Sequence, residues 1–189
     1  VELYNDPVPI FDALGIELEI SRALNRTVWL KSGGYIVIEQ TEALFVIDVN
    51  TGRYVGKGNQ ADTILKTNLE AVKEIAYQIR LRNLGGIIIV DFIDMEKKAD
   101  RQAVLDTLQE ALKKDRAKTN ISGISDLGLV QMTRKRVREN LRSQMCDPCP
   151  HCEGRGSIKS TRSIAYDILR SVRKEAGTHV EEKILVLAH

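Results

Sequence analysis

Two aspartates each end a strongly apolar stretch of this sequence, and two carboxylates held close together form a site for a hard metal ion. Asp48 ends the apolar part of FVIDVN, and Asp91 follows the three isoleucines of GGIIIVDFIDM. Oxygen ligands favour Mg²⁺ or Mn²⁺, which keep several waters and leave positions open for a phosphate and a nucleophile. Aspartate after a strand also commonly forms a cap or turn, so the residue types alone leave both roles open.

The segment between these aspartates predicts two buried strands joined by a helix. The strands are expected at Ala43 to Val49 and at Gly86 to Val90. A capping box of Thr67 and Glu70 is expected to begin the helix, and Gly85 with Gly86 to end it. Apolar residues recur between them at helical spacing, at Leu69, Val72, Ala76 and Ile79. A crossover of this length joins parallel strands, so both aspartates are predicted at the carboxyl edge of one sheet.

Three cysteines gather between Cys146 and Cys152, which suits a metal site better than a disulfide framework. Cys149 and Cys152 form a CxxC followed by glycines that permit a tight turn around thiolates. His151 is expected to be exposed, and Cys146 is either a third ligand or a small buried thiol. A second copy of the chain would complete a tetrahedral Cys₄ zinc site at a twofold axis. A redox CxxC is the rival interpretation.

Composition sets limits on the rest of the chain. With 43% hydrophobic residues in 189, one sizeable core is expected, and a net charge of +2 restricts nucleic-acid affinity to local patches. The sequence contains no membrane-spanning run and no signal peptide, so a cytoplasmic setting is the default expectation. The fold class is α/β, a mixed sheet with crossover helices. Four parts are predicted: residues 1–40, too small for their own core; the α/β body, 41–142; a cysteine knuckle, 143–159; and a final part, 160–189.

Further elements are predicted within the body and after it. A helix is expected around Arg101 to Lys114, with Val104, Leu105, Leu108, Ala111 and Leu112 buried, and a strand at Leu127 to Met132. The basic run from Arg134 to Arg142 is expected on a helix with Val137 and Leu141 facing inward. The final part is expected to be a helix with an apolar face of Ile164, Ile168 and Val172, followed by a strand from Lys183 to Ala188.

Four stretches, in this order, resemble the catalytic half of the RNase E/G family of bacterial endoribonucleases. They are TEALFVIDVNTGR, TNLEAVKEIAYQIRLRNLGGIIIVDFIDM, GLVQMTRKR and CPHCEGRG, and the third cysteine and MTRKR are most similar to the RNase G branch. The resemblance implies that Asp48 and Asp91 bind magnesium and that Asn50 orients Asp48 and the attacking water. It also implies that Cys149 and Cys152 form a zinc link shared by two protomers of a homodimer or higher oligomer.

The resemblance further implies the identity of each part. The body corresponds to a DNase I-like subdomain, residues 1–40 to the end of an RNase H-like subdomain, and residues 160–189 to the start of a small dimerisation domain. Family members carry an oligonucleotide-binding barrel and a 5′-monophosphate sensor ahead of this region, and neither is found in this sequence. The family's aromatic platform for RNA is expected to be missing as well, and with aromatics at only 5% of the residues nothing is expected to replace it. We therefore expect an intact metal centre with impaired substrate binding.

The implied activity is metal-assisted hydrolysis of phosphodiesters in single-stranded RNA, leaving 5′-phosphate and 3′-hydroxyl ends. Arg53, Lys57, Arg134 and Arg136 are candidates for phosphate contacts. The alternative to RNA contact for the basic run is a solvated helix face. Two other function classes remain open, a zinc-clasped oligomerisation module without catalysis and an enzyme acting on a small nucleotide ester. The latter is disfavoured because GRYVGKGN lacks the ending of a phosphate-binding loop.

Overall fold

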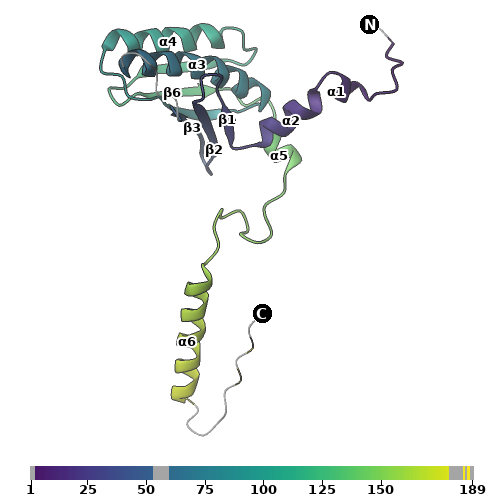
Figure 1. Ribbon diagram of the computed structural model, residues 1–189, viewed down its shortest axis with the longest axis vertical. Helices are drawn as coiled ribbons and strands as arrows, with labels where there is room; N and C mark the ends of the chain where they lie inside the picture. The colour runs from purple at the N-terminus through teal and green to yellow at the C-terminus, as the bar shows by residue number, and fades with distance from the viewer. Residues whose placement is uncertain (1–2, 53–59, 179–184, 186, 188–189) are drawn as a thin grey trace. The chain divides into compact units, whose positions relative to one another are not determined.

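The computed structural model describes residues 3–52, 60–178, 185 and 187, and divides the chain into two compact units, Val1–Cys146 and Asp147–His189 (Figure 1). The first unit is an α/β body built on one six-stranded sheet. Its helices are α1 (Ile10–Ala13), α2 (Ile16–Leu24), α3 (Gln60–Leu81), α4 (Lys98–Leu112) and α5 (Leu141–Met145). Its strands are β1 (Thr27–Trp29), β2 (Tyr35–Gln40), β3 (Leu44–Asn50), β4 (Gly86–Asp91), β5 (Thr119–Ile124) and β6 (Leu129–Arg134). The second unit contains α6 (Thr161–Thr178).

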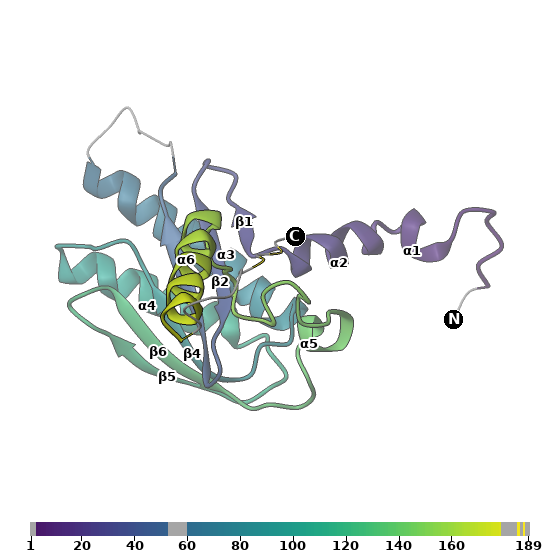
Figure 2. The same cartoon turned by 90° about the horizontal axis from the view of Figure 1, so that it is seen from below.

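The sheet is mixed, with strand order β1-β2-β3-β4-β6-β5 (Figure 2). Among the strands that the structure describes, β3 and β4 run parallel, and every other adjacent pair is antiparallel. This pair is the predicted crossover, and α3 is its connecting helix. The fold prediction is thus confirmed as a mixed α/β sheet with a crossover helix, while β5, which pairs with β6 at the edge, was not predicted.

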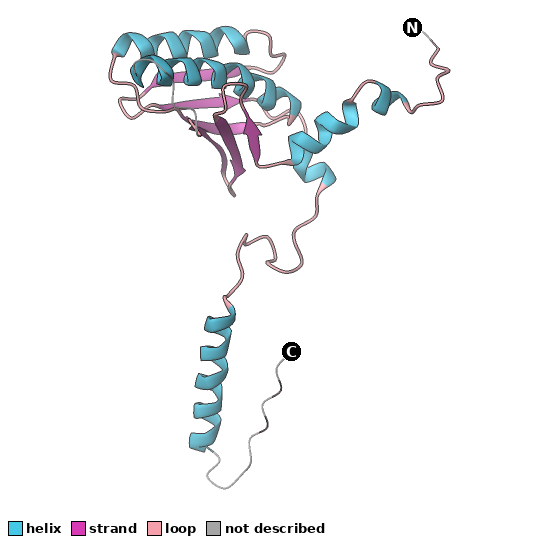
Figure 3. Ribbon diagram, in the orientation of Figure 1, coloured by secondary structure: helices cyan, strands magenta, loops and turns pink. Residues whose placement is uncertain are grey.

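Helices α3 and α4 lie on the same face of the sheet (Figure 3). Alternate strand residues point into this layer and are almost completely buried, as the pattern of β3 shows with Phe45, Ile47 and Val49. They pack against apolar residues of both helices, among which Val72, Ile75, Ile79, Val104 and Leu108 have no exposed surface. The intervening strand residues lie on the opposite, partly exposed face, which we call the open face.

The ends of α3 differ from the prediction. The helix already includes Thr67, whose hydroxyl donates a hydrogen bond to the Thr63 carbonyl, so Thr67 and Glu70 do not form a capping box. At the other end Asn83 adopts a left-handed conformation with φ 51°, and Leu84 N–H reaches back to the Ile79 carbonyl at 2.9 Å. This closure is a Schellman motif, so Asn83 ends the helix and the two glycines that follow do not.

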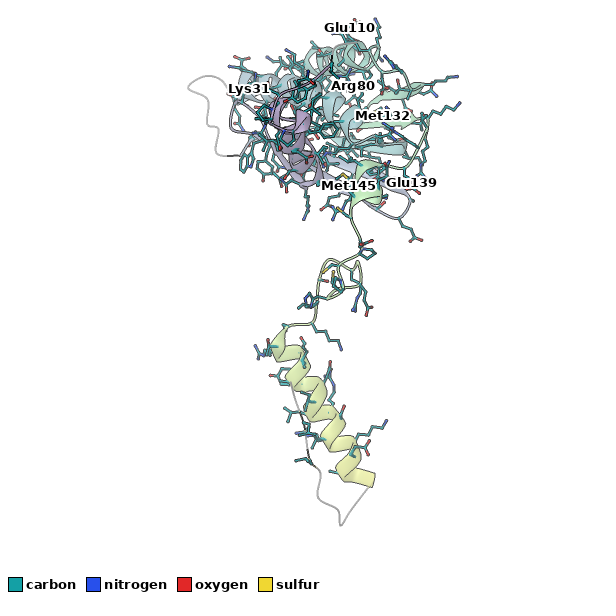
Figure 4. All side chains as sticks on the ribbon, turned by 90° about the vertical axis from the view of Figure 1, so that its right-hand side faces the viewer. Lys31, Arg80, Glu110, Met132, Glu139 and Met145 are labelled. Atoms are coloured by element: carbon teal, nitrogen blue, oxygen red, sulfur yellow. The ribbon has the colours of Figure 1, made fainter. Side chains whose placement is uncertain are left out.

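The basic run is not helical, contrary to the prediction. Arg134 is the last residue of β6, residues 135–140 form an irregular segment, and α5 begins only at Leu141. Val137, expected to face inward, is 69% exposed. The strand at this end runs from Leu129 to Arg134, because pairing with β4 and β5 extends it two residues beyond Met132. Glu139, which precedes this short helix, and Met145, its last residue, are labelled in Figure 4.

Three other predicted elements are α4, the helix α6 with its apolar stripe, and a strand near the end of the chain. Helix α4 lies where expected and buries Val104, Leu105, Leu108 and Leu112. In α6 the predicted apolar stripe is only partly covered, since Ile164 is 46% exposed. The predicted strand from residue 183 to 188 falls mostly outside the described residues. Among the described helices, none combines the length and apolar character needed to cross a membrane.

Candidate active site

Asp48 and Asp91 lie side by side at the end of the parallel strand pair. The register of β3 and β4 makes them direct partners, and the alternation of buried residues places both on the open face. Asp48 is half-buried and Asp91 is exposed. The two strands therefore bring together two side chains that are 43 positions apart in the sequence, because a crossover returns the chain in the same direction.

Asn50 adds an amide to this pair. Its Nδ2 donates a hydrogen bond to Asp48 Oδ2 at 2.8 Å, which fixes the orientation of that carboxylate. Residues two apart on a strand share a face, so Asn50 projects from the open face beside Asp48. The structure thus brings Asp48, Asn50 and Asp91 together. Among the residues described, no group of three or more carboxylate, histidine or cysteine side chains is arranged to hold a metal ion.

The electrostatics of the pair favour a cation. Partial desolvation raises the pKa of Asp91 above its ordinary value, and the negative charges of Asp48 and then Asp94 raise that pKa further. A divalent ion between the two aspartates would replace this repulsion by attraction and lower the pKa again. The carboxylate pair therefore concentrates negative charge, which attracts a cation.

Behind the pair, a buried amide holds the segment that follows Asp91. Asn68 of α3 is completely buried, its Nδ2 donates to the Ile93 carbonyl at 2.8 Å, and Ile93 N–H donates to its Oδ1 at 3.1 Å. Sequence reasoning missed this residue. The signal was a polar side chain next to the apolar stripe of an amphipathic helix, where a buried amide must find partners. Asn68 thereby connects the crossover helix to the end of β4.

The predicted phosphate contacts are distributed differently. Arg134 is 6% exposed and its guanidinium forms a two-pronged ion pair with Asp115, at 2.7 Å and 3.1 Å. It also donates to the Leu84 carbonyl at 2.8 Å, so Arg134 is a structural residue and not a surface cation. Arg136 is exposed but lies over Gly85 and Gly86 at the start of β4. Its Nε donates a hydrogen bond to the Gly85 carbonyl.

These arginines lie at the opposite end of the strands from the aspartates. Arg134 pairs with Gly86 across β4 and β6, whereas Leu129 pairs with Asp91. Five residues of strand correspond to roughly 17 Å. Arg53 and Lys57 lie outside the described residues. The structure therefore does not bring the predicted basic residues that it describes to the carboxylate pair.

Cys149 and Cys152 belong to a tight turn. Glu153 N–H donates to the Cys149 carbonyl, and Gly154 and Gly156 adopt the positive φ angles that such a turn requires. Cys149 is exposed and Cys152 half-buried, and the thiols are free. Backbone N–H groups of Cys152 and then His151 lower the pKa of the Cys149 thiol, which favours the thiolate that binds metals. His151 is exposed, as predicted, and so is Cys146.

Comparison with known sequences decides the family. The sequence model described as Ribonuclease E/G family matches residues 1–137, and a second one, described as RNase E/G, Thioredoxin-like domain, matches residues 148–189. The chain belongs to the ribonuclease E/G family. Both of its compact units are thus covered by models of this family. The comparison confirms the resemblance seen in the four sequence stretches.

Named relatives in this family are ribonucleases G and E. Ribonuclease G of Salmonella typhimurium (strain SL1344) is 51% identical over 188 residues, and that of Escherichia coli (strain K12) is 50% identical over the same length. Ribonuclease E of Escherichia coli (strain K12) is 44% identical over 176 residues, 93% of this chain and 17% of that protein. The chain spans only 38% of the length of those ribonuclease G proteins. The higher identity to them agrees with the predicted likeness to the RNase G branch.

Proposed function

We propose that this chain carries the catalytic carboxylates of a metal-dependent endoribonuclease that hydrolyses single-stranded RNA in RNA processing and decay. The observation that carries the proposal is the direct pairing of Asp48 with Asp91 on an open sheet face. Membership of the ribonuclease E/G family supports the reaction class. The proposed products are RNA fragments with 5′-phosphate and 3′-hydroxyl ends.

The donor set fits Mg²⁺ or Mn²⁺. Two carboxylates at neighbouring strand ends supply hard oxygen ligands, and the exposure of Asp91 leaves room for the waters that Mg²⁺ retains. When bound, the ion would acidify a water and withdraw charge from a phosphate oxygen. The two aspartates would hold it. Desolvation raises the pKa of Asp91, and the negative charge of Asp48 raises it further, so an ion between them would relieve a repulsion already present.

Asn50 has two tasks in this proposal. Its Nδ2 donates a hydrogen bond that keeps Asp48 Oδ2 in one orientation. The side-chain oxygen of Asn50, Oδ1, is then an acceptor for a water. A water held by this acceptor would be aligned for attack on a phosphodiester lying across the open face. Replacement by aspartate would keep the acceptors but remove the donor and add a third negative charge.

The organisation of the chain follows the family in this proposal, with one refinement. The DNase I-like catalytic part extends to residue 142, followed by the zinc link at 143–159 and the start of a small dimerisation domain at 160–189. Strands β1 and β2 hydrogen-bond into the same sheet as β3, so the remnant of the RNase H-like part is better limited to the residues up to the end of α2. The proposed setting is the cytoplasm.

The test of catalysis is cleavage of a 5′-monophosphorylated single-stranded oligoribonucleotide with and without Mg²⁺. Asp91→Asn is expected to lose at least about 100-fold in rate, since it removes a carboxylate from the metal site. Asp94→Asn is the matched control, because Asp94 is an exposed carboxylate three residues away. Equal rates for native protein and Asp91→Asn, or cleavage without divalent ions, would refute the mechanism.

A second measurement separates the metal site from RNA delivery. Mn²⁺ binding, followed by electron paramagnetic resonance, is expected for the native chain and for Asp94→Asn but not for Asp48→Asn. Binding without cleavage would locate the defect in RNA capture. Full Mn²⁺ affinity in Asp48→Asn would contradict the assignment of the carboxylate pair.

The zinc link is a separate part of the proposal, supported by the free, exposed thiol of Cys149 and its lowered pKa. Two protomers would each contribute Cys149 and Cys152 to one Zn²⁺ and form a homodimer. Half an equivalent of zinc per chain and a monomeric, zinc-free Cys152→Ser variant are expected. A dimeric Cys152→Ser variant with zinc bound would exclude the shared site. An oligomerisation module without catalysis remains the alternative function, and it predicts zinc-dependent dimers with no nuclease activity.

A further inference from the structure

An aromatic pair stands on the open face, next to the proposed active site. Trp29 of β1 and Tyr35 of β2 are direct partners in the sheet, and their ring centroids lie 5.1 Å apart at an interplanar angle of 56°. Trp29 is 70% exposed, whereas Tyr35 is half-buried. The tyrosine thus supports one side of the indole while the rest of that ring remains available to a ligand.

The sheet register links this pair to the carboxylates. Tyr35 is the direct partner of Asn50 across β2 and β3, so Trp29, Tyr35 and Asn50 form one row across the open face. Neighbouring strands are about 4.8 Å apart, which puts Trp29 roughly 10 Å from Asn50 along this row. Successive nucleotides are separated by at least about 3.4 Å along a stacked strand, so no more than about three nucleotides would cover that distance.

We propose that Trp29 and Tyr35 form a stacking platform for a nucleobase of single-stranded RNA, within a few nucleotides of the phosphate at Asp48 and Asp91. This inference rests on the proposed nuclease function and adds a substrate subsite to it. Exposed aromatic rings bind single-stranded nucleic acid because every base offers a π-face for stacking. The platform needs only two aromatic residues, so a low aromatic content does not preclude it. The inference revises the expectation that nothing replaces the family's aromatic platform.

Two cations lie near the platform in the sequence, and one of them, Arg26, lines the same surface hollow as Trp29. Lys31, labelled in Figure 4, lies exposed in the loop between β1 and β2 and has no ion pair with any residue that the structure describes. Arg26 precedes β1, is 65% exposed at its side chain, and pairs with Glu39. A phosphate backbone that crosses the row from Asn50 to Trp29 would meet positive charge beyond the indole. A protein surface or a second copy could also cover an exposed tryptophan, but continuity with the carboxylate pair favours RNA.

The test uses the complete chain and a labelled single-stranded oligoribonucleotide of about ten nucleotides, within the usual site sizes. Binding is measured by fluorescence anisotropy in EDTA, so that no cleavage occurs. Trp29 is the only tryptophan in the sequence, and its emission is expected to be quenched as RNA saturates the protein. Trp29→Ala is expected to weaken binding about 10-fold, and Trp29→Phe to restore most of the affinity. Phe11→Ala, which removes an exposed aromatic ring from α1, is the matched control and should bind as the native chain does.

Asp91→Asn separates the platform from the catalytic proposal. It should bind RNA as tightly as the native chain and quench Trp29 equally, even though its cleavage is lost. Where native protein cleaves RNA, Trp29→Ala should raise KM with kcat largely retained. Unchanged RNA affinity in Trp29→Ala, unquenched emission at saturation, or no RNA binding by the native chain would overturn the platform and leave the carboxylate assignment untouched. A Trp29→Ala variant with altered oligomeric state and native RNA affinity would likewise show that this surface serves a protein interface.

Discussion

Replacing Arg134 by methionine tests whether this residue is a structural ion-pair partner or a surface contact for RNA. Its guanidinium binds both oxygens of Asp115, and the side chains of this pair are 6% and 4% exposed. The guanidinium also donates to the Leu84 carbonyl and to Asn83 Oδ1. The substitution leaves a buried carboxylate and a buried carbonyl without these partners. Removing one partner of a buried pair costs about 3–5 kcal/mol of unfolding free energy, and we expect Arg134→Met to fall in that range.

The assay is urea denaturation followed by Trp29 emission and by far-UV circular dichroism, with coincident transitions required for a two-state treatment. Lys135→Met is the control, since it removes an exposed cation from the next position and should change stability by less than about 0.5 kcal/mol. The double variant Arg134→Met with Asp115→Leu should recover much of the loss, because neither charge is then left alone in the interior. A loss below about 1 kcal/mol in Arg134→Met, combined with weaker RNA binding, would refute the structural role.

Three further predictions concern Asp115, Asn68 and Gly52. Burial by itself raises the pKa of Asp115, but hydrogen bonds from Arg134 and Ala117 lower it overall, so its contribution to stability is present above about pH 4 and is lost as pH falls through the lowered pKa. Acid titration of the urea midpoint should therefore show a steeper fall below about pH 4 in native protein than in Asp115→Asn. Asn68→Ala should lose about 1–3 kcal/mol and weaken Mn²⁺ binding, because Ile93 loses both partners, and unchanged Mn²⁺ affinity would argue against the coupling. Gly52→Ala should destabilise the chain by at least about 1 kcal/mol in the urea assay, because Gly52 has a φ of +62° and a Cβ would lie 2.4 Å from the Gly33 carbonyl oxygen. An unchanged free energy of unfolding would contradict this close packing.

The carboxylate pair was predictable because its signals are local and the topology rule is general. Apolar runs of strand length ended by aspartate, with a helix between them, require a parallel crossover, and a parallel crossover fixes the shared edge. The structure confirms both strands and the crossover helix. The sequence signals for the ends of that helix, a capping box and two glycines, were wrong. Thr67 lies within α3 and follows its first turn, and Asn83 supplies the left-handed residue that glycine was expected to provide.

The remaining errors come from contacts between segments that are remote in sequence. The basic run has the composition of a helix, yet Arg134 lies in the interior, where it pairs with Asp115. Asn83 accepts a hydrogen bond from Arg134, and its Nδ2 donates to the Arg138 and Glu139 carbonyls. A side chain that satisfies two backbone carbonyls holds the segment in an irregular path. Likewise, the nearness of Trp29 to Asn50 depends on strand register, which no periodicity within one strand reveals.

The direct pairing of Asp48 with Asp91 has a consequence for how the site comes into being. Their separation is set by the backbone hydrogen bonds between β3 and β4, and the helix layer buries the alternate residues that keep this register. A slip by a single residue would turn one carboxylate into the apolar core, which folding penalises heavily. Folding itself thus selects the correct spacing before any ion or RNA arrives. The carboxylates are preorganised, and ligand binding need not supply the free energy to assemble them.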